Sequence, residues 1–182
     1  MKKPSVTKLI DLLNKPALVN WANRIGLQGV DVRKYRKEVM GEGKKYHKEI
    51  ENFLKKKEPF SDPEMQEEFE CFFSDSEILG SEKKIETDYF VGVYDIKFKD
   101  NFTETTFLCD FKLNKKQIYL AQKLQLVAYQ MAEPVDEIGI ISINPPFFDM
   151  ILVDIEDFTP YEELLINLSN VYRILEENNE RL

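Results

Sequence analysis

Cysteine, histidine and glycine are scarce in this chain of 182 residues, which contains two, one and seven of them. The two cysteines, Cys71 and Cys109, form no C-x-x-C pair, so the sequence supports neither a disulfide framework nor a zinc or iron–sulfur site. Long apolar runs are also missing, because Asp11 and Asn14 interrupt the one near the N-terminus. We therefore expect no signal peptide, no membrane contact, no iron–sulfur cluster, and a reducing, cytoplasmic setting.

The chain does contain enough apolar residues for a core, at 43% of the total, and this predicts one globular domain over residues 1–182. Its charge is unevenly distributed. Residues 1–57 contain 15 Lys and Arg against 6 Asp and Glu, whereas residues 58–182 contain 10 against 27. Clustered cations in the N-terminal segment suit contact with nucleic-acid phosphates, although a solvated helix face explains the same pattern.

The spacing of apolar residues predicts an α/β fold. Helical patterns cover residues 5–13, 16–26, 32–54, 63–73, 115–132 and 161–182, and Gly41 and Gly43 are able to break or bend the third of these. Strand patterns cover residues 78–99, which we expect to form a hairpin, and residues 105–113, 137–143 and 147–153. This order predicts a central mixed β-sheet flanked by helices, with basic helices over residues 1–57 and the sheet within residues 58–182.

The tripeptide Asp110-Phe111-Lys112 is the first candidate site. Alternate side chains of a strand share a face, so Asp110 and Lys112 should point the same way as Leu108, and Phe111 the opposite way. Burying an acid and an amine is costly unless something compensates, and a divalent cation beside a reacting phosphate would do so. An ordinary ion pair at a strand end explains the same residues.

A second carboxylate, Asp95, follows a strand-like run that ends at Tyr94. If that strand pairs with the strand of Asp110, the two carboxylates converge, and Mg²⁺ prefers hard oxygen ligands of this kind. A turn position is the alternative for Asp95, although Asp100 suits that role better.

The single histidine, His47, falls on the predicted helix over residues 32–54, beside the apolar Ile50 and Leu54. This position predicts a side chain at the rim of the core. An imidazole suits Mn²⁺ when carboxylates stand opposite, and a purely structural or solvated histidine is the alternative.

Two polar residues, Gln125 and Tyr129, share one face of the helix predicted over residues 115–132, because they are four residues apart. They either satisfy hydrogen bonds between helix and sheet or orient Lys112 or a phosphate.

Four motifs in order carry a family resemblance: Gly43-x-x-x-His47-x-x-Ile50-Glu51, Gly92-Val93-Tyr94-Asp95, Asp110-Phe111-Lys112 and Gln125-Leu126-x-x-Tyr129. Over about residues 5–153 the chain resembles the RecB-like branch of the PD-(D/E)XK nuclease superfamily. That branch includes the nuclease domains of RecB and AddAB helicase–nucleases, CRISPR adaptation nucleases and lambda-type phage exonucleases. The resemblance implies a restriction-endonuclease-like core.

The resemblance also implies roles for individual residues. Metal ligands for Mg²⁺ or Mn²⁺ would be His47, Asp95, Asp110 and the main-chain carbonyl of Phe111. Catalysis would rest on Asp95, Asp110 and Lys112, with Lys112 positioning or activating the attacking water, and substrate binding on Gln125 and Tyr129. Glu51 is a weaker candidate, either for a second metal or for a role in supporting the metal ligands from outside. Iron–sulfur members carry a cysteine where Lys15 precedes Pro16 here, which again argues against a cluster.

The implied activity is that of a metal-dependent DNA nuclease, an exonuclease of recombination, repair or phage DNA processing. Its substrates would be linear double-stranded or single-stranded DNA ends in the bacterial or phage-infected host cytoplasm. A single-strand annealing protein or a helicase would be its partner, and the resemblance allows a homo-oligomer. The alternatives are a non-catalytic recombination adaptor or nucleic-acid-binding module with the same fold, and a structure-specific or RNA-directed endonuclease.

Overall fold

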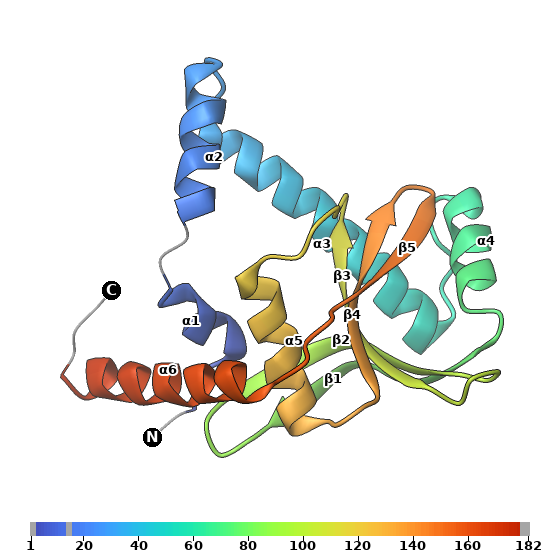
Figure 1. The fold of residues 1–182 in the computed structure, drawn as a ribbon. Coiled ribbons are helices and arrows are strands. Elements are labelled where there is room, and N and C mark those ends of the chain that lie inside the picture. The colour runs from blue at the N-terminus through green and yellow to red at the C-terminus, as the bar shows by residue number, and fades with distance from the viewer. Residues whose placement is uncertain (1–2, 14–15, 179–182) are drawn as a thin grey trace.

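A computed structural model describes residues 3–13 and 16–178. It confirms the predicted fold class, an α/β fold with a mixed sheet flanked by helices and an N-terminal helical segment (Figure 1). The helices are α1 (Val6–Asp11), α2 (Pro16–Leu27), α3 (Val32–Lys56), α4 (Pro63–Phe72), α5 (Leu120–Ala132) and α6 (Thr159–Glu177). The strands are β1 (Ser76–Glu86), β2 (Val91–Asp100), β3 (Thr106–Leu113), β4 (Glu137–Asn144) and β5 (Phe147–Leu152).

The five strands lie in sequence order, β1-β2-β3-β4-β5. Strands β1 and β2 form the hairpin predicted over residues 78–99. Neighbouring strands are antiparallel except β3 and β4, which are parallel and are connected through α5. A parallel pair needs such a crossover, and a helix usually provides it.

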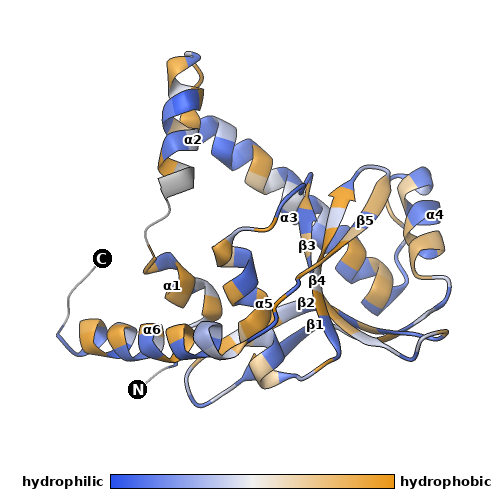
Figure 2. Ribbon diagram, in the orientation of Figure 1, coloured by the Kyte–Doolittle hydropathy of each residue, from blue (hydrophilic) through white to orange (hydrophobic). Residues whose placement is uncertain are grey.

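Helices cover both faces of the sheet (Figure 1). On one face α1, α5 and α6 pack around buried residues that include Leu108 of β3. On the other face α4 and the C-terminal part of α3 pack around an aromatic cluster that includes Cys109 and Phe111. The predicted alternation along β3 is therefore confirmed. Orange and blue segments alternate along α6 in Figure 2, as expected of an amphipathic helix that lies on a core.

Local signals explain where several helices begin. The side chain of Ser5 accepts a hydrogen bond from the main chain of Lys8 at the start of α1. Asp31 caps α3 in the same manner, and Asp62 caps α4, where Pro63 takes the first helical position. Such caps satisfy main-chain donors that have no partner within the helix.

The helices differ from the predicted ones in several places. Helix α3 continues through Gly41 and Gly43, so neither glycine breaks it. Helix α5 begins at Leu120 rather than at residue 115, because Asn114 adopts a positive φ of 50° and residues 114–119 form a turn. Helix α6 ends at Glu177, and the last predicted residues, 179–182, lie outside the described part. Among the described residues, no helix has the length and apolar character needed to cross a membrane.

Candidate metal centre

Asp95 lies where β2 separates from β3. The pairing of these strands runs from Lys99 opposite Thr106 to Ile96 opposite Cys109 and is not continued at Asp95. Instead, Oδ2 of Asp95 accepts a hydrogen bond of 2.7 Å from the main-chain N–H of Phe111. The side chain thus takes the place of a main-chain partner, and this holds a carboxylate that is only 8% exposed inside the sheet.

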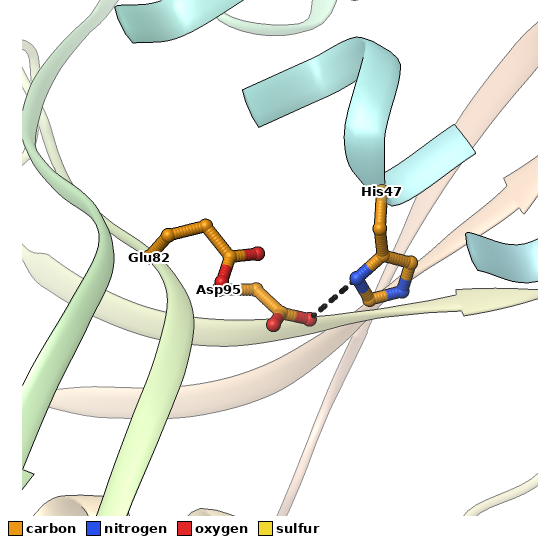
Figure 3. Close-up of side chains that lie close together, drawn as sticks. All are labelled: His47, Glu82 and Asp95. Carbon is orange, nitrogen blue, oxygen red and sulfur yellow. Dashed lines mark ion pairs between the residues drawn. The ribbon is translucent and has the colours of Figure 1, made fainter. Parts of the chain in front are cut away.

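Glu82 enters the site through an irregularity in β1. The ladder between β1 and β2 pairs Ser81 with Ile96 and Lys83 with Tyr94, but it includes no pair of Glu82 with Asp95. Glu82 has a φ of 48°, which is uncommon for a residue other than glycine. Ligand atoms of His47, Glu82 and Asp95 consequently lie within 4.8 Å of one another (Figure 3).

His47 projects from α3 toward these carboxylates. Its Nε2 lies 2.8 Å from the carbonyl oxygen of Phe111, and its Nδ1 lies 3.5 Å from Oδ2 of Asp95. Burial is the largest influence on the ring and lowers the pKa of His47 below its usual value, despite the nearby charge of Asp110. When the neutral ring donates its Nε2–H to the carbonyl oxygen of Phe111, Nδ1 carries a lone pair that faces Oδ2 of Asp95. Nδ1 and Oδ2 are then two hydrogen-bond acceptors that lie opposite each other.

Asp110 and Lys112 point to the same side of β3, as predicted, and form an ion pair. Asp110 is 2% exposed, and its Oδ1 accepts a hydrogen bond of 3.0 Å from Gln125 Nε2. The same amide nitrogen of Gln125 donates to the hydroxyl of Tyr129 at 2.7 Å. Lys112 is the sole partner found for Oδ2 of Asp110 among the described residues. Gln125 and Tyr129 therefore support Asp110 from α5.

The acids of the site are held in an unfavourable electrostatic setting. Burial, and then the charge of Asp110, raise the pKa of Asp95 well above its usual value. Burial, and then Glu51, raise the pKa of Glu82. Burial on its own would lower the pKa of Lys112, but the charges of Asp110 and Asp95 outweigh it, so that this pKa is raised. Asp95 and Asp110 thus lie buried close to each other beside the ammonium of Lys112, which is a setting that a further cation would relieve.

These donors suit a divalent metal ion. Two carboxylates and an imidazole nitrogen match the ligands of Mn²⁺, and carboxylates with water match those of Mg²⁺. His47, Glu82 and Asp95 could hold such an ion, and the identity of the metal is not fixed by these residues. The two facing acceptors on His47 and Asp95 are the specific feature that fits a cation between them.

The cluster opens into a cleft of about 630 Å³ between α3, the part of β1 around Glu82 and the end of β3. Lys44 and Lys48 line this cleft together with His47, Glu82 and Lys112. Lys48 forms an ion pair of 2.7 Å with Glu51, whereas no carboxylate pairs with Lys44 among the residues that the structure describes. The cleft therefore joins a candidate metal centre to a wall that carries positive charge.

The structure brings the predicted residues together in two connected groups. His47 and Asp95 belong to the metal cluster, and Asp110 and Lys112 form the adjacent pair with Gln125 and Tyr129 behind it. The carbonyl of Phe111, expected to bind metal, contacts His47. Glu51 pairs with two lysines, Lys48 and Lys55, at the edge of the cleft.

The sequence does not predict Glu82 as a residue of the site. The predicted strand showed no regular alternation there, and nothing in the residues around Glu82 marked the positive φ that turns it toward His47. The glutamate stands 13 residues before Asp95 on the other arm of the hairpin, and a fixed register between β1 and β2 would have been needed to place it.

Comparison with known proteins supports the fold alone. No family model matches the chain, and no curated protein matches it. A solved structure titled "Crystal structure of SSO0001" is similar, with a TM-score of 0.50 over 96% of this chain and 77% of that chain. The two sequences are 14% identical, so the likeness concerns the α/β architecture and assigns no activity.

Proposed function

We propose that this protein is a divalent-metal-dependent nuclease that hydrolyses phosphodiester bonds in DNA, with Mg²⁺ or Mn²⁺ as its cofactor. The observation that supports this proposal is the juxtaposition of two groups. The acid and amine pair of Asp110 and Lys112 lies next to the cluster of His47, Glu82 and Asp95, at the end of an open cleft. In metal-assisted phosphate hydrolysis carboxylates hold the ion, and a cationic donor near the reacting phosphate stabilises the charge that develops there.

The metal ligands and Lys112 have different roles in the proposed reaction. His47, Glu82 and Asp95, with Asp110 beside them, would hold the ion, which when bound supplies Lewis-acid polarisation of a phosphoryl oxygen and a more acidic water. Lys112 has a raised pKa, so it is protonated near neutral pH and acts as a hydrogen-bond donor to a phosphate oxygen or to the attacking water. The attacking water gives up one proton to the solvent as its oxygen bonds to phosphorus. The bond from phosphorus to the leaving sugar oxygen breaks, and the leaving oxygen takes up a proton from the solvent.

Gln125 and Tyr129 act behind this pair. The amide of Gln125 donates to Asp110 and to the Tyr129 hydroxyl, so it restrains the orientation of the carboxylate that faces Lys112. Such outer contacts fix the geometry of groups that meet the substrate.

Contact with DNA would begin at the cleft. Lys44 on its wall provides a cation without a carboxylate partner among the described residues, and the preceding part of α3 contributes further exposed cations, among them Lys34 and Lys37. Such contacts hold a phosphate backbone without reading its sequence. Binding should therefore weaken with added salt.

A digestion time course with end-labelled linear DNA tests the proposal. We expect cleavage by the wild type with Mn²⁺ or Mg²⁺ and none with EDTA. Lys112→Met and Asp110→Asn should each reduce the rate by about 10²-fold or more. Lys116→Met is the matched control, because Lys116 is an exposed lysine of the following turn, and it should retain the wild-type rate.

Intact DNA after incubation of the wild type with both metals would contradict the proposal and favour a non-catalytic adaptor. Cleavage that survives in Lys112→Met would contradict the role of this amine. Parallel reactions with closed circular DNA and with RNA separate an exonuclease from an endonuclease and from an RNA-directed enzyme, because only an endonuclease cuts a circle.

A further inference from the structure

Lys115 occupies a fixed position in the turn between β3 and α5. Its main-chain N–H donates to Ser142 Oγ at 2.8 Å, and Ser142 Oγ donates to its carbonyl oxygen at 2.9 Å. The preceding Asn114 donates from its main chain to the carbonyl of Ile143 at 2.9 Å. Ser142 is fully buried in β4, so the backbone of Lys115 is anchored to an inner strand of the sheet. A side chain on such a rigid support is suited to a binding role.

The ammonium of Lys115 is positioned by an aromatic ring and lacks an acidic partner. Its Nζ lies 4.3 Å from the centroid of the Tyr119 ring, at a distance typical of a cation–π contact. No carboxylate pairs with Lys115 in the part of the chain that the structure describes. Burial, and then the nearby charge of Lys112, lower its pKa, so the two ammonium groups are close enough to repel each other.

The two lysines differ in how their charge is compensated. Lys112 is neutralised by Asp110, with which it forms an ion pair. Lys115 is half-buried, and among the described residues its ammonium has only the face of the Tyr119 ring as a partner. Holding a second cation there costs free energy, and an anion bound beside it would recover that cost. The turn therefore presents an uncompensated positive charge beside the residue to which we assign the reacting phosphate.

We propose that Lys115 binds a phosphate group of the substrate strand, next to the phosphate that reacts at Lys112. This inference rests on the proposed nuclease function and adds a positioning residue to it. Tyr119 holds the ammonium in place by its ring, and Ser142 holds the turn. Lys116, the next residue, is exposed and has no comparable contact with any ring of residues 3–13 or 16–178, so it offers a control of equal charge.

Binding of a fluorescein-labelled single-stranded oligonucleotide, followed by anisotropy in EDTA at several salt concentrations, tests this inference. Lys115→Met keeps an unbranched stem against Tyr119 and removes the charge. We expect it to weaken binding about three- to tenfold and to reduce the salt slope by about 0.7, the share of one phosphate contact on a single strand. Lys115→Arg should stay within about twofold of the wild type, because the charge is kept. Lys116→Met should change neither quantity by as much.

Cleavage kinetics with Mn²⁺ provide the second readout. For Lys115→Met we expect a higher KM with little change in kcat, since a phosphate contact away from the reacting bond contributes to binding. Thermal midpoints of all variants should agree within a few degrees, and Lys115→Arg guards against a folding defect in Lys115→Met.

Equal effects of Lys115→Met and Lys116→Met on binding would overturn the inference and leave the nuclease proposal standing, provided that the wild type cleaves DNA. A loss in Lys115→Arg as large as that in Lys115→Met would reduce Lys115 to a packing role and overturn it as well. A wild type that neither binds nor cleaves DNA would instead refute the proposed function, and the inference with it.

Discussion

At the level of single residues, the site is defined by acceptors that face one another. Nδ1 of a neutral His47 and Oδ2 of Asp95 are 3.5 Å apart, and the Asp95 carboxylate is buried close to the charge of Asp110. Such an arrangement destabilises the folded state unless a proton or a cation is present. The arrangement thus lowers the stability of the metal-free protein and favours the binding of a positive ion.

Asp95→Asn should separate stability from metal binding. The amide removes the buried negative charge, and its oxygen can still accept the hydrogen bond from Phe111. In EDTA we expect the free energy of unfolding to rise by about 1 kcal/mol, a typical size for one substitution, while stabilisation by Mn²⁺ is lost. Urea titrations with EDTA and with Mn²⁺ measure both effects, and Asp88→Asn, at an exposed loop position, is the control. If Asp95→Asn has a lower free energy of unfolding than the wild type in EDTA, the buried carboxylate does not destabilise the metal-free protein.

Glu82→Gln tests the ligand that the sequence did not reveal. If Glu82 is a ligand, as its distance from His47 and Asp95 suggests, the amide should weaken Mn²⁺ binding by about tenfold or more. Titration calorimetry measures the affinity. Glu86→Gln, on the same strand but outside the cluster, should bind Mn²⁺ as the wild type does. Unchanged affinity in Glu82→Gln would remove Glu82 from the site.

The residues of the candidate site were predictable where they followed a regular strand. Alternation along β3 placed Asp110 and Lys112 on one face, and strand pairing brought Asp95 close to them. Glu82 was not predictable, because its position depends on a positive φ and on the register of a hairpin. Neither property is visible in a run of side chains.

At the level of elements, close contact between β1 and β2 depends on the absence of a side chain at Gly80. A Cβ at this position would lie 2.5 Å from the hydroxyl of Tyr94, whose side chain is fully buried. Tyr94 packs with the core on the α5 side, whereas Ile96 and Phe98 of the same strand pack with the opposite core. The strand changes faces between Tyr94 and Ile96, next to Asp95, so this packing helps to shape the metal centre.

Gly80→Ala should therefore destabilise the protein by about 1–3 kcal/mol, the usual cost of inserting a methyl group into a packed core. Gly41→Ala is the matched substitution, because a Cβ there meets nothing within 4 Å and Gly41 lies inside α3. It should leave stability unchanged or raise it by up to about 1 kcal/mol. Thermal or urea unfolding compares the two variants. A smaller loss for Gly80→Ala than for Gly41→Ala would contradict the packing described for Tyr94.

The end of α5 is tied to the sheet by an ion pair whose effect depends on pH. Glu133 accepts a hydrogen bond of 2.9 Å from Lys97 Nζ, and this bond is the main cause of the lowered pKa of Glu133. A lowered folded pKa means that the pair stabilises the fold above the unfolded value of about 4.3 and stops doing so as pH falls through the folded value.

Glu133→Gln should therefore be less stable than the wild type at pH 7, by less than about 1 kcal/mol for a partly exposed pair. The difference should shrink toward zero as pH falls through the lowered pKa of Glu133. Urea unfolding at several pH values follows this difference. If the difference in free energy of unfolding between the wild type and Glu133→Gln stays constant down to acidic pH, Glu133 acts through packing rather than through its charge.

The fold was largely predictable from the pattern of elements, because strand-rich and helix-rich stretches alternate clearly. The ends of individual helices were harder to predict. The turn before α5 depends on the left-handed conformation of Asn114 and on the hydrogen bonds of Lys115 to Ser142, which involve residues distant in sequence. Gly41 and Gly43 were compatible with a broken helix, but the surrounding residues of α3 maintain it.

At the level of the whole molecule, the uneven distribution of charge along the chain matches the position of the candidate site in the fold. Most cations of residues 1–57 lie on α3, and α3 forms one wall of the cleft that leads to His47. The acids of the remaining chain include the candidate ligands Glu82, Asp95 and Asp110. A net charge of −8 therefore coexists with a basic surface beside the site, and it does not exclude a polyanionic substrate.

An anomalous difference map from crystals soaked in Mn²⁺ tests the proposed metal centre most directly. We predict a single strong peak among His47, Glu82 and Asp95, close to Asp110 and absent after treatment with EDTA. Two results would contradict the proposed centre. The map has no peak at this position although Mn²⁺ is bound elsewhere in the crystal, or it has no peak there and the three side chains have moved apart.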